Sequence, residues 1–140
     1  MPLKVEYLNE RRGVLSEASG KLTGTELLQA LTEVNSPALA ERPILYTFFD
    51  FNGATGVDIT ATEIRGAADL SVIASRYQSD GRVVAIYAKS DLTFALARMW
   101  QILVGETGWE TYVFRDRSEA VKWMCERVAL RFNVQVAIDT

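Results

Sequence analysis

Two apolar segments constrain the fold of this chain more than any other feature. Residues 44–51 (ILYTFFDF) and residues 82–88 (RVVAIYA) are nearly all apolar and rich in β-branched and aromatic side chains. A strand with one face in water would alternate apolar and polar residues, so these segments predict strands that are buried on both faces. Such strands belong in the middle of a sheet that helices cover on both sides.

Helix-start patterns separate the predicted strands. Thr23 and Thr60 each stand three residues before a glutamate, a capping-box arrangement that satisfies free N–H groups at a helix start. Ser90-Asp91 and Asp116 offer further N-caps. We therefore expect four helices, from Thr23 to about Val34, from Thr60 to about Ser79, from Ser90 to about Val104 and from Asp116 to about Val128.

Shorter segments complete the sheet. Residues 1–22 predict an N-terminal hairpin, residues 110–114 a short strand, and residues 129–140, in which apolar and polar residues alternate, one extra strand. Residues 52–58 (NGATGVD) are expected to form a loop. Alternating strands and helices predict an α/β fold with a mixed, largely parallel sheet of about five to six strands and four helices. Residues 1–140 are expected to form a single domain.

Composition excludes several kinds of function. The 140 residues include no histidine and one cysteine, which rules out a Ser-His-Asp or Cys-His site and an internal disulfide within this chain. A net charge of −3 gives no electrostatic reason to bind nucleic acid. We find no metal-loop spacing, no nucleotide-binding motif and no apolar run that could cross a bilayer. We expect a cytoplasmic, non-enzymatic protein with no metal or cofactor.

Four phrases between Gly20 and Met124 resemble the SpoIIAA-like family, which is related to STAS domains: GKLTGTELLQAL, YTFFDFNGATGVDITATEIRGAADL, RVVAIYAKSDLTFALARMWQ and TGWETYVFRDRSEAVKWM. The resemblance implies a SpoIIAA/STAS-like fold. Better-known relatives are partner-binding switches in bacterial sigma-factor control, in which a serine of an Asp-Ser-Ser-Gly phrase is phosphorylated. The matching residues here are Asp58-Ile59-Thr60-Ala61, which keep the acid and one hydroxyl.

Polar side chains follow the predicted parallel strands where each strand ends. The carboxyl ends of parallel strands meet at one edge, where helix N-termini also gather and favour anions. We expect a partner- or ligand-binding surface there, formed by Asp50, Asn52, Thr55, Asp58, Thr60, Lys89, Ser90, Asp91 and Arg115.

Two of these residues have competing interpretations. Thr60 is either a phosphorylated or partner-contacting hydroxyl or a plain N-cap, and the two roles are compatible. Asp50 is either a general base with a raised pKa or, as is more common for such a residue, an acceptor for loop N–H groups.

The third predicted helix is apolar around most of its circumference, including Phe94, Met99, Trp100 and Leu103. Such a helix must be covered on more than one side. The cover is either the second helix together with the C-terminal tail, or a dimer contact or apolar ligand. An unpaired tail strand would also favour a homodimer.

The leading functional hypothesis is a non-enzymatic regulatory or protein-interaction module that meets its partner around Asp58 and Thr60. The alternative is a binder of a small apolar or lipid-like ligand, suggested by the apolar third helix. Catalysis by carboxylates, a lysine or tyrosines ranks third, because no recognisable arrangement unites them.

Overall fold

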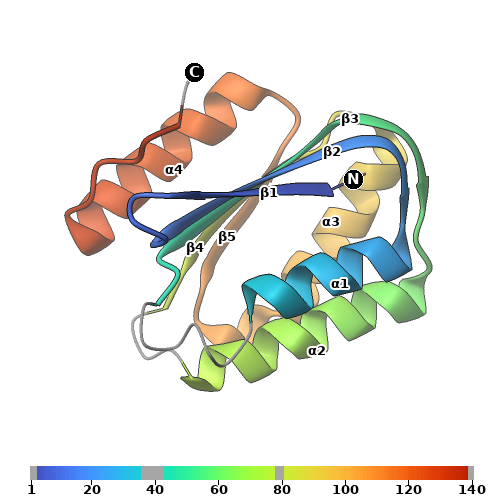
Figure 1. Ribbon diagram of the computed structural model, residues 1–140, viewed down its shortest axis with the longest axis horizontal. Coiled ribbons are helices and arrows are strands. Elements are labelled where there is room, and N and C mark those ends of the chain that lie inside the picture. Colours follow the sequence, from blue (N-terminus) through green and yellow to red (C-terminus); the bar gives the residue numbers. More distant parts are fainter. Residues whose placement is uncertain (1–2, 36–42, 78–80, 139–140) are drawn as a thin grey trace.

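The computed structural model describes residues 3–35, 43–77 and 81–138. Its elements are β1 (Leu3–Leu8), β2 (Gly13–Thr23), α1 (Gly24–Val34), β3 (Tyr46–Asp58), α2 (Ala61–Tyr77), β4 (Val83–Tyr87), α3 (Asp91–Leu103), β5 (Glu110–Phe114) and α4 (Arg117–Phe132). The strands form one sheet in the order β1-β2-β3-β4-β5. Helices α1, α2 and α3 lie on one face of the sheet and α4 lies on the other (Figure 1). No helix in the described part of the chain is both long and apolar enough to cross a membrane.

The pairing of the strands confirms the predicted α/β class. β1 and β2 form the antiparallel N-terminal hairpin, whereas β2–β3, β3–β4 and β4–β5 pair in parallel. The sheet is therefore mixed and largely parallel, with five strands and four helices.

The two central strands are buried on both faces, as their composition predicts. Side chains alternate between two cores, because successive residues of a strand point to opposite sides. Phe49 and Ile86 pack towards α1, α2 and α3, while Phe48, Val83 and Ala85 pack against α4.

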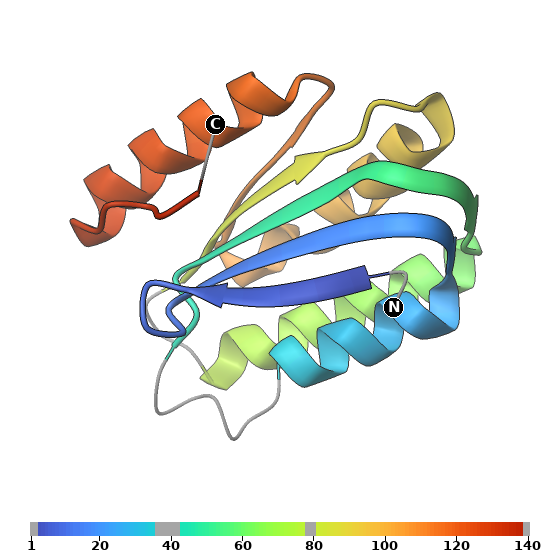
Figure 2. The same ribbon diagram turned by 45° about the horizontal axis from the view of Figure 1, so that its top comes forward.

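β3 is longer than the sequence predicts, because residues 52–58 form a strand and not a loop. They pair in parallel with the end of β2, from Ser19↔Gly53 to Thr23↔Asp58. β4 stops pairing with β3 at Asp50↔Tyr87, so β2 and β3 continue together as a two-stranded extension, here called the ribbon (Figure 2). The prediction of a loop was wrong because the glycines of this segment are typical of loops, while its backbone hydrogen bonds depend on a strand distant in sequence.

The C-terminal tail is not the extra strand that its alternation predicts. Residues 129–132 belong to α4, which ends at Asn133 in a left-handed conformation with φ 56°. Residues 134–138 pair with no strand. Val134 and Ile138 pack on the α4 side of the sheet, and the Asn9 side chain binds the backbone of Gln135 and Ala137. The alternation thus reflects one apolar side lying against the core.

One part-buried contact connects the start of β3 to the turn after β1. The Tyr46 hydroxyl donates a hydrogen bond to Asn9 Oδ1, and burial raises the pKa of that hydroxyl. The Tyr46 ring lies directly over Gly13, where an added Cβ would be 2.0 Å from the ring carbon Cζ.

Gly13→Ala is therefore expected to destabilise the protein by about 1–3 kcal/mol, the usual cost of overpacking a core. Urea unfolding followed by circular dichroism measures the change. Gly105→Ala is the matched control, because a Cβ at Gly105 meets nothing within 4 Å. Equal midpoints for both variants would contradict the proposed clash.

Candidate functional site

The carboxyl ends of β4 and β5 hold a small polar cluster. Arg115 forms an ion pair with Asp91 at 2.8 Å and donates from Nη1 to the Lys89 carbonyl oxygen at 3.2 Å. Its guanidinium also lies 4.1 Å from the centre of the Phe94 ring. The Ser90 hydroxyl accepts from the Thr93 N–H at 3.3 Å, which caps α3. Lys89, Ser90, Asp91 and Arg115 thus come together, as the topology predicts.

Thr60 caps α2 from the end of the ribbon. Its hydroxyl accepts from the Glu63 N–H at 3.1 Å and donates to Glu63 Oε1 at 3.1 Å, while the Thr60 N–H donates to the same carboxylate oxygen at 2.9 Å. The predicted capping box is confirmed, and Thr60 is exposed to solvent. Any further role for its hydroxyl remains a prediction.

Asp50 lies apart from Thr60. It points to the α4 face of the sheet, where its carboxylate is 3.3 Å from Arg117 Nε and accepts from the Asn52 N–H at 2.9 Å. These contacts are those of an acceptor for nearby N–H groups, which is the second of the two interpretations of Asp50 given above. Asn52, Thr55 and Asp58 are exposed along the ribbon and not in a loop.

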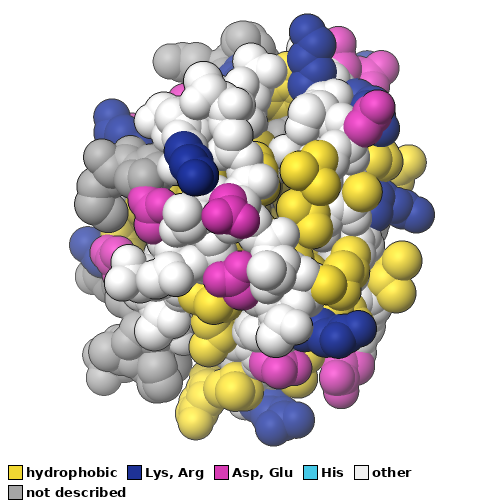
Figure 3. Space-filling view, turned by 90° about the vertical axis from the view of Figure 1, so that its right-hand side faces the viewer, with side chains coloured by type: hydrophobic (Ala, Val, Ile, Leu, Met, Phe, Trp, Pro, Cys, Tyr) yellow, Lys and Arg dark blue, Asp and Glu magenta, His cyan; other side chains and the backbone are white. Residues whose placement is uncertain are grey.

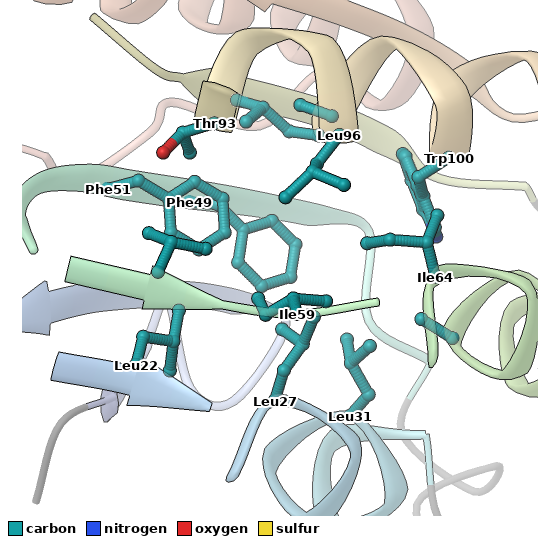
Figure 4. A pocket seen from close by; sticks show the side chains of 14 residues that line it. Leu22, Leu27, Leu31, Phe49, Phe51, Ile59, Ile64, Thr93, Leu96 and Trp100 are labelled. Carbon is teal, nitrogen blue, oxygen red and sulfur yellow. The ribbon is translucent and has the colours of Figure 1, made fainter. Parts of the chain in front are cut away.

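An apolar pocket separates the ribbon from α3. It has a volume of about 50 Å³ and is lined by Leu22, Leu27, Leu31, Phe49, Phe51, Val57, Ile59, Ile64, Ala67, Ile86, Thr93, Leu96, Ala97 and Trp100. Figure 4 shows Thr93 and Leu96 of α3 facing the side chains of Phe51 and Ile59 across this space. Thr93 supplies the one polar side chain of the lining, and its hydroxyl is already bonded to Ser90 Oγ at 2.8 Å.

The pocket brings the two ends of the predicted surface together. Ile59 precedes Thr60 in the chain, and Thr93 is the residue that Ser90 caps. The pocket lining thus includes the residue that precedes Thr60 and the residue whose N–H the Ser90 hydroxyl caps. On this face of the molecule, hydrophobic side chains gather with acidic side chains beside them (Figure 3).

Sequence reasoning missed the pocket residues contributed by the ribbon, chiefly Leu22, Val57 and Ile59. Isolated apolar residues beside glycines carry little periodic signal. A clue was available in the apolar residues that flank each capping box, since a residue before an N-cap often packs on the first helical turn.

α3 is covered on one side within the chain and open on another. Trp100 is buried and its Nε1 donates to Ser71 Oγ of α2 at 3.3 Å, whereas Phe94 and Met99 are half-buried. Leu103 is 38% exposed and the neighbouring Ile102 is 72% exposed. The tail does not contribute to the cover, because it packs on the opposite face of the sheet.

At α4, on the other face of the sheet from the pocket, two shifted pKa values have ordinary structural causes. The hydrogen bond from the Ser118 hydroxyl holds the pKa of Asp116 below its usual value. Burial raises the pKa of Cys125, the one cysteine, which packs against the α4 core. Within residues 3–35, 43–77 and 81–138, no three His, Cys, Asp or Glu side chains group as metal ligands.

Gly53→Ala is expected to disrupt the ribbon locally, because an added Cβ would lie 2.4 Å from the Ala18 carbonyl oxygen. Hydrogen exchange by NMR should show faster exchange in residues 19–23 and 53–58, with the β3–β4 core still protected. Gly56→Ala is the control, since its Cβ meets only Lys21 Cγ, at 3.8 Å. Unchanged protection in Gly53→Ala would contradict this account of the ribbon.

Comparison with known proteins supports this architecture. No family model matches the chain, and no curated protein matches it. A solved structure of an uncharacterised DUF3478-family protein from Shewanella loihica PV-4, described as having a SpoIIAA-like fold, is 21% identical with a TM-score of 0.53 and covers 88% of this chain and 92% of its own. The unphosphorylated anti-sigma factor antagonist SpoIIAA is 12% identical with a TM-score of 0.49, over 86% and 96% of the two chains. The five-stranded mixed sheet with four helices is therefore a SpoIIAA-like fold.

Proposed function

We propose that this chain is a non-enzymatic regulatory module that binds a partner protein through the pocket and its polar rim. The observation that carries the proposal is the apolar pocket at the carboxyl edge of a parallel sheet, lined by Ile59 next to Thr60 and by Thr93, which Ser90 caps. Ligands and partners of open α/β sheets gather at that edge. The resemblance to partner-binding switches supports the same conclusion.

The size of the pocket favours a protein partner over a large ligand. Its volume of about 50 Å³ accommodates part of one apolar side chain. Pockets for drug-sized ligands and cofactors are usually about 300–1,000 Å³. Protein interfaces concentrate their binding energy in a few apolar anchors that fill pockets and are ringed by groups that exclude water. We propose that the exposed residues Asp58, Thr60, Lys89 and Ser90 form such a ring here.

Thr60 is the residue through which this surface would be regulated. A phosphate on its hydroxyl would add about −1.5 to −2 charges at the N-terminus of α2, where the helix dipole favours anions. It would also remove the hydrogen bond that Thr60 donates to Glu63 and place like charges near Asp58 and Glu63. Modification would thereby change the charge of the pocket rim without unfolding the core.

The hydrogen bonds and ion pairs that the titratable residues already make argue against catalysis. Asp50 accepts from Arg117 and the Asn52 N–H, and Asp91 is paired with Arg115. The pocket itself carries only the Thr93 hydroxyl as a polar lining side chain. A site for acid–base catalysis needs a titratable group within hydrogen-bond reach of a substrate, and this pocket supplies none among its described residues.

Affinity capture from an extract of the source organism, followed by quantitative mass spectrometry, tests whether the chain binds a partner protein through this surface. We expect a retained protein whose affinity for the purified chain falls about tenfold or more, or about 1.4 kcal/mol, in the Asp58→Ala, Thr60→Ala double variant. Thr62→Ala and Asp69→Ala, which alter exposed residues of α2, should bind normally.

Loss of the N-cap alone would cost about 1 kcal/mol of stability, so melting curves accompany the binding data. Thr60→Ser keeps both the cap and the hydroxyl and should preserve binding. A partner that binds the double variant as tightly as the native chain would exclude this surface.

A second candidate is a small apolar ligand in the same pocket. The almost wholly apolar lining favours it, although the volume restricts the ligand to a few buried carbon atoms. Native mass spectrometry of protein purified without detergent should then show an added mass that is lost in Ala97→Leu, which fills the pocket. A spectrum of the unliganded mass alone would count against this candidate.

A further inference from the structure

We propose that the partner is an extended peptide segment that adds as a strand to the open edge of β3 and places one apolar side chain in the pocket. This inference rests on the proposed function and specifies the form of the partner. Three features of the ribbon carry it: an unpaired strand edge, the position of that edge beside the pocket, and an unpaired charge at its end.

The first feature is the open edge. β4 pairs with β3 only as far as Asp50↔Tyr87, whereas β2 pairs with β3 as far as Thr23↔Asp58. Within the described residues, Asn52–Asp58 therefore have a strand neighbour on one side only (Figure 2). A strand edge with free N–H and C=O groups is a template for an added strand.

The second feature is the position of that edge. Phe51 and Val57 of β3 line the pocket, and Thr93 and Leu96 of α3 line it from the facing side (Figure 4). Neighbouring strands lie about 4.8 Å apart, so a strand added to this edge would run between β3 and α3, over the pocket. Its side chains would alternate, and one of those that face inward would enter the apolar space.

The third feature is charge. Asp58 ends β3 beside Val57 and is exposed, and its carboxylate forms no ion pair or hydrogen bond with the described residues. A basic side chain close to the apolar anchor would meet that carboxylate. The geometry thus specifies an extended segment with an apolar residue, such as Leu or Phe, near a Lys or Arg.

A second copy of the same chain fits this edge poorly. The open stretch, Asn52–Asp58, contains one sizeable apolar residue, Val57, and no basic residue. Pairing two copies along it would supply no cation for Asp58. The same stretch of a second copy therefore does not complement this edge, and we assign the added segment to another protein.

Selection of short peptides from a random phage-displayed library against the whole chain tests the inference. Selected peptides should share an apolar residue near a basic one within an extended pattern that alternates every second residue. In synthetic versions, N-methylation of every second amide should reduce affinity at least tenfold in one alternating set and leave the other set nearly unchanged, because a strand presents only alternate N–H groups to its neighbour. NMR shifts should concentrate in residues 51–60 and 90–97.

Matched variants of the chain locate the binding. Ala97→Leu fills the pocket and should weaken the peptide at least tenfold, whereas Ala95→Leu, exposed on the same helix, should not. Asp58→Lys should weaken peptides with a basic residue, and Asp69→Lys should leave them unaffected. If Ala97→Leu does not fold, Asp58→Lys, which changes an exposed residue, still tests the proposal.

The outcomes separate the two proposals. Failure to select any peptide, a helical spacing of anchors, tolerance of N-methylation at every amide, or equal binding by Asp58→Lys would overturn strand addition. If the captured native partner still depends on Asp58 and Thr60 in that case, the interaction module stands and only its binding mode is wrong. If the peptide results contradict strand addition and the captured partner does not depend on Asp58 and Thr60, both proposals fail.

Discussion

Burial of β3 and β4 on both faces is the constraint on which the rest of the molecule depends. Neither strand has a polar face to offer water, so both sides of the sheet must be covered. Parallel neighbours need crossover connections, and α1, α2 and α3 supply these while covering one face. α4 and the tail cover the other face. The same parallel arrangement places the N-termini of α2, α3 and α4 near one edge of the sheet.

The proposed binding surface lies where this regular arrangement stops. β4 and β5 end together at Tyr87 and Phe114, but β2 and β3 continue as the ribbon. The continuing strands can no longer pack on a full sheet, so their apolar side chains turn towards α1, α2 and α3 and leave the pocket between them. A pocket beside an unpaired strand edge is thus a direct result of unequal strand lengths.

Much of the fold and part of the site were predictable from local patterns. The two capping threonines, the Ser90 cap and the apolar strands follow from a few neighbouring residues each, and the structure contains all of them. Asp50 was placed on the shared surface because it ends an apolar run, yet its side chain points to the α4 face. A one-residue step along a strand reverses the face, so grouping residues by loop alone cannot separate Asp50 from Phe51.

The helix starts, the buried strands and the order of elements follow from the amino-acid sequence alone, because capping and hydrophobic burial act through side chains a few residues apart. That residues 52–58 form a strand and residues 134–138 do not is evident only from the three-dimensional fold. Strand formation depends on hydrogen bonds to a distant segment: β2 pairs with residues 52–58, whereas residues 134–138 pair with none of the described strands. The pocket has the same origin, since its lining comes from segments as far apart as Leu22 and Trp100.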